Sequence, residues 1–342
     1  MSRPTLVTIS RQGRASLTAG DWERLEAVAD VRVVERAGHP SAHEAVGLLA
    51  GANVVGCTNV CLPTLDDPLL ERLPRLQWVV LYATGYDHLD VEVLARRGVG
   101  LSVLPQYATT AVAEHALAML LALATRLHLA NDRSRGSAPP TTSLRGVELA
   151  GRTLGIIGVG RIGSHLARLA TGIGMRVVGH DRNPVAATRA VAAGIRMTSL
   201  DGLLSGSDAV AVCASHVFGG PAILGGAQVA RMRAGSFMVN IGRPGLVDTA
   251  AIVDALRRGA LRGYGVDDVV LGAEDEDLVR EGRLLQTGHS AWWRDEVLAR
   301  GTSMWGERLL GAVSGTPRDV VAWPAAGAPL PARNGRAGAA GA

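Results

Sequence analysis

The sequence lacks lysine entirely and contains only three cysteines. All 35 basic residues are therefore arginines, which excludes a catalytic lysine amine or a lysine Schiff base. Cys57, Cys61 and Cys213 form no CxxC pair and have no neighbouring histidines at ligand spacing, so neither a disulfide framework nor a zinc site is expected. This cysteine usage fits a reducing compartment, and we expect a cytoplasmic protein without a metal ion.

The sequence also lacks a long hydrophobic run and a dense cluster of basic residues. Its longest strongly apolar stretch, 116–124, is far shorter than the roughly 20 residues that a transmembrane helix needs. The first ten residues lack the charged and apolar regions of a secretory signal. The net charge is +4, but the arginines are spread along the chain and form no patch typical of nucleic-acid binding. We expect neither a membrane nor a nucleic-acid partner.

Short apolar runs alternate with segments of helical periodicity along most of the chain. At 342 residues the chain exceeds what one hydrophobic core usually organises, so two domains are expected. Alternating strands and helices predict βαβ units and an α/β fold with doubly wound parallel sheets. The first part predicts a flavodoxin-like unit with about five parallel strands, and the part from 153 to about 286 predicts a Rossmann-like unit. The apolar runs of the first part lie at 6–9, 31–34, 52–55, 76–80 and 99–103.

A single, very apolar helix is expected at 110–127, between these two series of strands. It is too hydrophobic to lie on the surface of a monomer, which predicts a homodimer. His115 on this helix is expected to be a buried histidine with satisfied hydrogen bonds and not a catalyst. A polar loop is expected at 131–145, and 323–342, rich in alanine, glycine and proline, is expected to be disordered.

A glycine motif follows the predicted strand 153–157. Gly158, Gly160 and Gly163 form the pattern GxGxxG, and a helical stretch follows them. Gly158 permits a tight turn, Gly160 lets backbone amides approach a pyrophosphate, and Gly163 allows the helix to pack closely on the strand. Asp181 ends the next strand, eighteen residues beyond Gly163, where a carboxylate that binds ribose hydroxyls is expected. The sequence predicts a dinucleotide site that favours NAD over NADP, although Arg182 beside Asp181 could favour a 2′-phosphate.

Two further residues indicate chemistry on a carbonyl compound. Arg243 follows the predicted strand 236–239, at the end where ligands of α/β sheets bind, and a guanidinium there can hold a carboxylate with two hydrogen bonds. His289 follows a later strand, and an imidazole can donate a proton to a carbonyl oxygen near neutral pH. Arg243 and His289 are therefore the candidate catalytic residues.

With these motifs in order, the chain resembles the D-isomer-specific 2-hydroxyacid dehydrogenase family, and within it most the glycerate dehydrogenase/hydroxypyruvate reductase branch. The resemblance extends from about Val54 to Val321. Besides the glycine motif it includes the segments Ala83-Thr84-Gly85-Tyr86-Asp87-His88-Leu89-Asp90, Val112-Ala113-Glu114-His115, Met232-Arg233-Ala234-Gly235 and Asn240 to Asp248. It implies hydride transfer between a nicotinamide cofactor, NAD, and a small 2-oxo or 2-hydroxy carboxylate.

The resemblance also implies roles for individual residues. Thr84 and Gly85 would present backbone amides to the substrate carboxylate, and Asn59 would lie on a second loop facing the substrate. Arg243 would bind and polarise the substrate, and His289 would be the acid/base. The residues assigned to cofactor binding are Gly158, Gly160, Arg161, Ile162, Gly163, Asp181, Arg182, Cys213, Ile241, Gly242 and Asp267.

The sequence departs from the family where the histidine is oriented. The family has a glutamate five residues after the aspartate that corresponds to Asp267, and here that position is Gly272. Glu274 or Asp275 could supply the carboxylate if the loop is shifted, or the pair is broken; we select Glu274 as a further candidate catalytic residue. The stretch Cys213-Ala214-Ser215-His216 also replaces the usual His-x-Pro-Leu beside the cofactor.

The expected domain organisation is discontinuous. Residues 1–108 and 290–322 would form the substrate domain, and 109–289 the NAD-binding domain with the dimerisation helix. Two functions are compatible with the sequence: an active dehydrogenase, favoured by Arg243 and His289, or a catalytically weakened NAD(H) sensor or scaffold, favoured by the missing glutamate.

Overall fold

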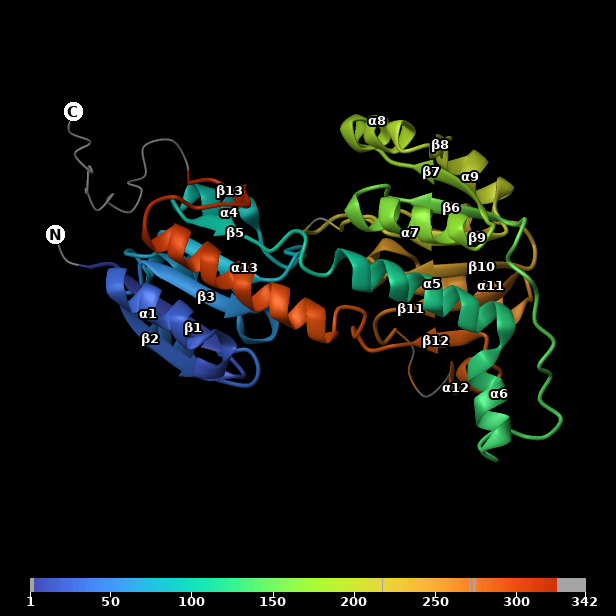
Figure 1. The fold of residues 1–342 in the computed structure, drawn as a ribbon, viewed down its shortest axis with the longest axis horizontal. Helices are drawn as coiled ribbons and strands as arrows, with labels where there is room; N and C mark the ends of the chain where they lie inside the picture. The colour runs from blue at the N-terminus through green and yellow to red at the C-terminus, as the bar shows by residue number, and fades with distance from the viewer. Residues whose placement is uncertain (1–2, 217, 271, 273–274, 325–342) are drawn as a thin grey trace. The chain divides into compact units, whose positions relative to one another are not determined.

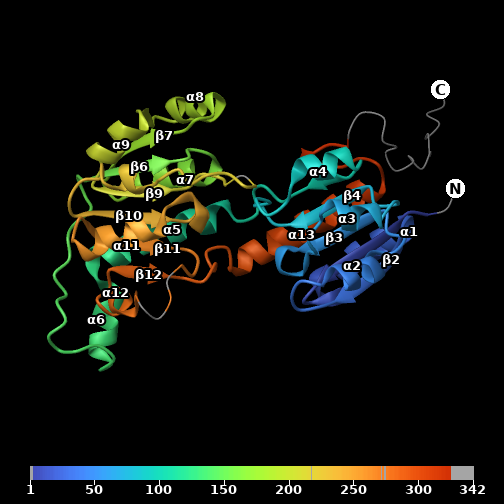
Figure 2. The same cartoon turned by 180° about the vertical axis from the view of Figure 1, so that it is seen from behind.

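The computed structural model describes residues 3–216, 218–270, 272 and 275–324. The chain divides into two compact units, which are Met1–Tyr107 with Asp295–Ala342 (unit 1) and Ala108–Arg294 (unit 2). Each unit has helices packed around its own sheet (Figures 1 and 2). Glu274 and all but the first two residues of the predicted disordered tail, 323–342, lie outside the described residues.

Unit 1 contains a six-stranded sheet in the order β13-β5-β4-β3-β1-β2. Five of these strands are parallel, and β13 is antiparallel to β5. The predicted flavodoxin-like sheet is thus confirmed, with β13 as a strand that the sequence pattern did not indicate. The elements of unit 1 are β1 (Thr5–Ser10), η1 (Gly13–Ser16), α1 (Ala19–Val28), β2 (Asp30–Glu35), α2 (Ala42–Leu49), β3 (Val54–Thr58), η2 (Asn59–Cys61), α3 (Asp67–Glu71), β4 (Trp78–Tyr82), α4 (Val91–Arg96), β5 (Gly100–Ser102), α13 (Asp295–Val313) and β13 (Val320–Ala322).

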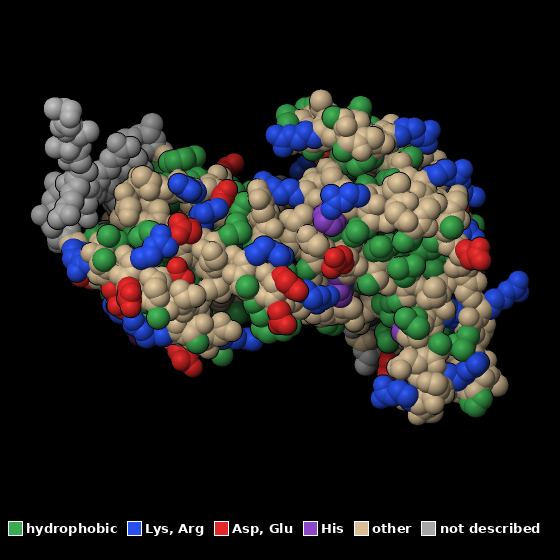
Figure 3. Space-filling model, in the orientation of Figure 1, with side chains coloured by type: hydrophobic (Ala, Val, Ile, Leu, Met, Phe, Trp, Pro, Cys, Tyr) green, Lys and Arg blue, Asp and Glu red, His purple; other side chains and the backbone are tan. Residues whose placement is uncertain are grey.

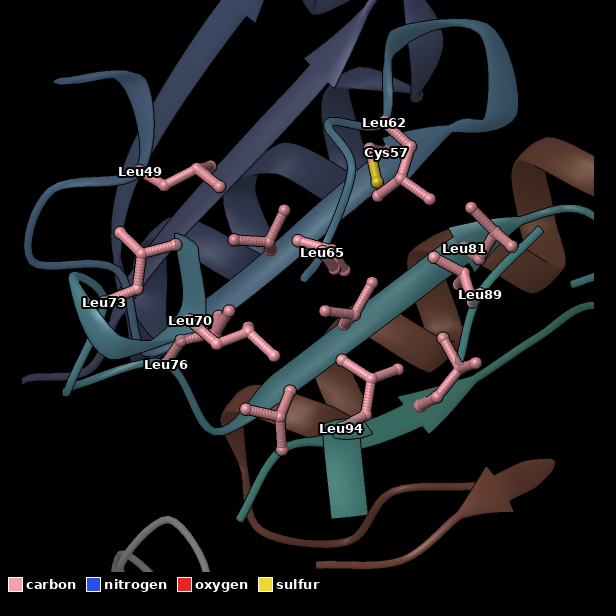
Figure 4. Packing of buried hydrophobic residues seen from close by; sticks show 14 of the residues in the cluster. Leu49, Cys57, Leu62, Leu65, Leu70, Leu73, Leu76, Leu81, Leu89 and Leu94 are labelled. Atoms are coloured by element: carbon pink, nitrogen blue, oxygen red, sulfur yellow. The ribbon is translucent and has the colours of Figure 1, made fainter. Parts of the chain in front are cut away.

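The core of unit 1 lies on both faces of its central strands, which explains why β3 and β4 do not alternate between apolar and polar residues. On one face α13 packs, and buried Trp305 donates its indole N–H to the carbonyl of Val80 at 3.2 Å. Gly56 of β3 makes room for this helix, since a Cβ there would lie 2.6 Å from Leu309. On the other face a cluster of leucines from the helices and loops, including Leu49, packs on the strands (Figure 4).

Unit 2 contains a seven-stranded parallel sheet in the order β12-β11-β10-β9-β6-β7-β8. The strand order reverses between β6 and β9, and ligands of such sheets bind beyond the carboxyl ends of the strands at that point. The predicted Rossmann-like sheet is confirmed. The elements of unit 2 are α5 (Thr109–Thr125), α6 (Leu127–Ser134), β6 (Thr153–Ile157), α7 (Arg161–Gly172), β7 (Arg176–His180), α8 (Pro184–Ala192), β8 (Arg196–Met197), α9 (Leu200–Gly206), β9 (Ala209–Val212), α10 (Gly226–Val229), β10 (Ser236–Asn240), η3 (Pro244–Leu246), α11 (Thr249–Arg257), β11 (Leu261–Val266), α12 (Glu276–Arg280) and β12 (Leu284–Gln286).

The sequence predicted one helix at 110–127 followed by a polar loop at 131–145. That prediction was wrong between 126 and 134, where the structure has a break and a second helix. Helix α5 ends at Thr125, and Arg126 adopts a left-handed conformation with φ of 58°. The chain then turns by 63° into α6, which continues to Ser134. A single left-handed residue ends a helix, but no composition signal marks it when that residue is an arginine. On the face of unit 2 seen in Figure 3, hydrophobic side chains gather over α5.

Helix α13 begins at Asp295, with Asp295 and Glu296 in its first turn, where acidic side chains favour a helix N-terminus. Trp293 lies before it in a turn closed by its amide, which donates to the carbonyl of Ser290 at 3.0 Å.

Within the described ranges, no single helix is long and apolar enough to cross a membrane. Helices α5 and α6 reach that length and hydrophobicity only when taken together, and they form a bent pair. Among the same residues, no three or more His, Cys, Asp or Glu side chains are grouped as a metal site would require.

Candidate functional site

The turn between β6 and α7 has the geometry that its three glycines require. Gly158 has φ of 91°, in the left-handed region, and a Cβ on it would lie 2.6 Å from the backbone nitrogen of Ala214. A Cβ on Gly163 would lie 2.1 Å from the carbonyl oxygen of Gly158, so the helix can pack against the turn only without a side chain there. Gly160, the N-cap of α7, faces open space instead. The turn therefore leaves a free approach to the N-terminus of a twelve-residue helix, where backbone amides can bind phosphate.

Asp181 lies against this turn. It follows β7, and its Oδ2 accepts a hydrogen bond from the amide of Val159 at 2.9 Å, while its Oδ1 accepts one from the amide of Asn183 at 2.8 Å. The structure thus brings together the carboxylate and the glycine turn that the sequence spacing had linked. Arg161 and Ile162 form the first turn of α7, and Arg182 is exposed beside Asp181.

The loop after β9 closes the other side of the glycine turn. The amide of Cys213 donates to the carbonyl of Ile157 at 2.8 Å. Burial raises the pKa of the Cys213 thiol to about 12, so this thiol is protonated near neutral pH and is not a nucleophile. Its backbone lies directly beside Gly158, since a Cβ on that glycine would lie 2.9 Å from the carbonyl carbon of Cys213.

Arg243 lies on the loop after β10, and Asn240 holds that loop. The side chain of Asn240, which is fully buried, donates to the carbonyl of Arg243 at 2.8 Å and accepts from the amide of Gly242 at 3.0 Å. Gly242 also passes close to the loop after β9, since a Cβ on it would lie 2.7 Å from the carbonyl oxygen of Ala214. Ile241, which precedes it, is buried. The Arg243 loop is thereby fixed beside the loop after β9, which also lies against the glycine turn.

His289 lies on the loop between β12 and α13, and Asp267 anchors this loop. The Oδ1 atom of Asp267 accepts hydrogen bonds from the hydroxyl of Thr287 at 2.7 Å and from the amides of Ser290 at 2.8 Å and Ala291 at 3.1 Å. His289 itself adopts φ of 59°, a left-handed conformation that a non-glycine residue rarely adopts. Left-handed strain held by several hydrogen bonds is common in functional loops.

Among the carboxylates of the described residues, the one that pairs with His289 is one that sequence reasoning missed. The Oδ2 atom of Asp268 lies 3.8 Å from Nδ1 of His289. Asp275, one of the two carboxylates considered from the sequence, is instead paired with Arg257 at 2.6 Å. Glu274 lies outside the described residues, and Gly272 has no side chain. An aspartate directly after Asp267 was visible in the sequence, but nothing in a linear pattern indicates which carboxylate faces the ring.

His115 of α5 belongs to the same part of unit 2. Its Nε2 lies 3.0 Å from the hydroxyl of Thr287 and 3.8 Å from Oδ1 of Asp267, and Arg294 lies 3.2 Å from its Nδ1. Burial lowers the pKa of His115, the carboxylate of Asp267 opposes this, and the charge of Arg294 adds to it. A neutral imidazole in this network helps to hold the loop that carries His289.

The three substrate-binding candidates of unit 1 follow neighbouring strands. Asn59 begins η2 directly after β3, and Thr84 and Gly85 follow β4. Because Thr58 pairs with Tyr82 in the sheet, both segments start from the same edge. The hydroxyl of Thr84 donates to the carbonyl of Leu104 at 2.6 Å, which fixes that side chain toward the loop after β5.

The NAD-binding half of a known family matches most of unit 2. The matching family model is the D-isomer specific 2-hydroxyacid dehydrogenase, NAD binding domain, over residues 117–291. The fold agrees: the TT0316 protein from Thermus thermophilus superposes with a TM-score of 0.77 at 29% identity, covering 92% of this chain and 99% of that one.

Curated relatives extend the match beyond this domain. The D-lactate dehydrogenase of Escherichia coli (strain K12) is 30% identical over 263 residues, which cover 71% of this chain and 79% of that protein. The hydroxypyruvate reductase of Blautia hydrogenotrophica is 28% identical and aligns over 88% of this chain and 94% of its own length. The D-3-phosphoglycerate dehydrogenase of Mycobacterium tuberculosis aligns over only 38% of its length.

These matches cover both units and include the glycine turn and the loops of Arg243 and His289. The chain therefore belongs to the D-isomer specific 2-hydroxyacid dehydrogenase family, the oxidoreductases that interconvert 2-oxo acids and D-2-hydroxy acids with a nicotinamide cofactor.

Proposed function

We propose that this chain uses NADH to reduce a small 2-oxo acid to its D-2-hydroxy acid, with Arg243 and His289 as its catalytic residues. One observation carries the proposal. The glycine turn, the Arg243 loop and the His289 loop follow β6, β10 and β12 of one parallel sheet. Carboxyl ends of parallel strands share one edge, so the groups that bind the cofactor and the groups that handle the substrate belong to the same crevice.

The residues at this edge fit a dinucleotide. The open space at Gly160 and the N-terminus of α7 suit a pyrophosphate, and Asp181 suits the ribose hydroxyls. The carboxylate of Asp181 repels a 2′-phosphate, and this supports a preference for NAD over NADP. A bound NADH supplies the hydride that reduces the substrate carbon.

The protein's own groups bind and protonate the substrate. The guanidinium of Arg243 holds the substrate carboxylate and polarises the adjacent carbonyl. His289 donates a proton to the carbonyl oxygen as that oxygen becomes a hydroxyl, and in the reverse direction His289 removes it. Because Nδ1 of His289 faces Asp268, Nε2 is the atom that exchanges the proton.

The two units and the assembly have their own parts in this function. Unit 1 is the substrate domain, to which Asn59, Thr84 and Gly85 contribute polar groups, and unit 2 is the cofactor domain.

A homodimer is supported by the apolar helix α5 and by the side chain of Leu127 at the start of α6, which is 66% exposed. Sedimentation at micromolar concentration tests the dimer, and a stable monomer would contradict it.

The substrate belongs to the short 2-oxo acids, and the glycerate dehydrogenase/hydroxypyruvate reductase branch is the preferred assignment. It rests on the alignment with the hydroxypyruvate reductase over 88% of the chain. The test is NADH consumption with hydroxypyruvate, glyoxylate and pyruvate, each compared with the Arg243→Gln variant. Turnover of hydroxypyruvate that Arg243→Gln abolishes supports the proposal. Tight NADH binding without turnover of any of the three acids would instead support the sensor.

A further inference from the structure

Two adjacent aspartates follow β11, and they face different atoms of the His289 loop. Asp267 is nearly buried, with 8% of its side chain exposed. Its Oδ1 already receives the Thr287 hydroxyl and the amides of Ser290 and Ala291. This carboxylate is fully engaged with the loop and is not available to the imidazole.

Asp268 is directed at the imidazole. Its Oδ2 lies 3.8 Å from Nδ1 of His289, while its Oδ1 accepts a hydrogen bond from the amide of Val269 at 2.8 Å. That hydrogen bond restrains the carboxylate at a distance where it attracts a protonated imidazole. One third of the Asp268 side chain and about half of the His289 side chain are exposed, so the ring is reachable by a substrate.

The charge of Asp268 also acts on Tyr264 of β11. Burial and the negative charge of Asp268 both raise the pKa of Tyr264, to about 12, so that its hydroxyl is neutral. Asn240 lies 3.5 Å from this hydroxyl and holds the carbonyl of Arg243. Tyr264 therefore experiences the charge of Asp268 and contacts Asn240, the residue that holds the Arg243 loop.

The other charged groups near His289 interact with partners other than its ring. Arg294 follows it, and its guanidinium donates to the carbonyl of Ser290 at 3.3 Å. His115 of α5 lies beside Arg294 and Asp267. On the side of α12, Asp275 is held by Arg257 of α11. Among the described carboxylates, only Asp268 forms an ion pair with the His289 ring.

We propose that Asp268 is the positioning carboxylate of His289. The two aspartates then have separate roles, because Asp267 fixes the backbone of the loop while Asp268 orients the imidazole and stabilises its protonated form. This inference rests on the proposed function. Asp268 supplies the carboxylate that Gly272, which has no side chain, cannot supply. It acts through His289 and touches neither the cofactor nor the substrate.

The test compares Asp268→Asn with Asp268→Glu and with Asp275→Asn as a matched control on the neighbouring loop. In Asp268→Asn, the pH at which reductive kcat/KM declines should fall by about half a unit to one unit, and kcat/KM at pH 8 should fall roughly three- to tenfold. The NADH dissociation constant should not change. Asp268→Glu should restore the pH profile in part, and Asp275→Asn should leave it as in the unmutated chain.

A second measurement does not depend on turnover. In the full-length protein without substrate, NMR titration of the histidine rings should move the titration of His289 to lower pH in Asp268→Asn and leave it unchanged in Asp275→Asn. If the chain reduces no 2-oxo acid but this shift is seen, the proposed function fails and the Asp268–His289 pair stands. An unchanged titration and pH profile in Asp268→Asn overturn the inference, as does a Glu274→Gln variant that alone produces the shift.

Discussion

The glycine turn and the His289 loop both follow strands of the same parallel sheet, yet they are built in different ways. The turn consists of backbone, and its geometry depends on three positions that have no side chain. The His289 loop depends on side chains, because Asp267 holds its amides and Asp268 faces its ring. A site made from backbone tolerates few changes, whereas a site made from side chains can obtain a carboxylate from another position in the loop.

The largest effect should come from the ring itself. His289→Gln should lower kcat for reduction on the order of 1,000-fold, because the proton donor is lost, and should leave the NADH dissociation constant unchanged. Stopped-flow reduction and fluorescence titration with NADH measure the two quantities. The control is His165→Gln on α7, which should keep full activity. If the NADH affinity of His289→Gln falls together with its kcat, then cofactor binding and proton transfer are not divided between the glycine turn and the His289 loop.

The next effect separates two glycines of the turn. Gly163→Ala places a Cβ 2.1 Å from the carbonyl oxygen of Gly158, and the strain should cost about 1–3 kcal/mol and lower the Tm of the protein without cofactor. Gly160→Ala places its Cβ in open space, so its Tm should not change. Both variants should bind NADH at least roughly tenfold more weakly. In Gly160→Ala the reason is that the added methyl group occupies the space through which the pyrophosphate reaches the helix N-terminus. Calorimetry and NADH titration give the comparison; equal Tm values for the two variants would contradict it.

A smaller effect concerns cofactor choice. Asp181→Ala removes the carboxylate from the glycine turn, and the preference for NADH over NADPH should narrow by about tenfold, the factor for one lost hydrogen-bonded contact. The ratio of kcat/KM for the two cofactors measures it, and Asp201→Ala on the surface of α9 is the control. If the unmutated chain already uses NADPH as well as NADH, Arg182 outweighs Asp181.

The smallest effect is on stability against acid. Burial lowers the pKa of His115 in the folded chain, so the unfolded chain binds protons more readily. The folded state therefore keeps its full stability above about pH 6.5, the ordinary value for histidine, and loses stability as the pH falls below it. Urea unfolding at pH 7.5 and 5.5 measures the loss, which should be smaller in His115→Gln. If His115→Gln loses the same free energy of unfolding between pH 7.5 and 5.5, the loss comes from other titratable groups.

Much of the fold followed from local patterns. Apolar runs such as 153–157 and 236–239 predicted strands that the structure has at Thr153–Ile157 and Ser236–Asn240. The helix after Thr109 was expected to run to 127, and it ends at Thr125 because Arg126 adopts a left-handed conformation that composition does not indicate. Strand β13 was not expected either, since three residues that pair only with β5 have no periodicity of their own.

The sequence by itself determined the glycine turn and its link to Asp181, because a glycine pattern after a strand and a carboxylate at the end of the next strand are set by spacing along the chain. Only the tertiary structure decided which carboxylate faces His289. Asp267, Asp268, Gly272 and Asp275 lie within nine residues, so spacing cannot distinguish them. Among the described carboxylates, Asp267 binds the backbone of the loop and Asp275 pairs with Arg257, and Asp268 lies beside the ring.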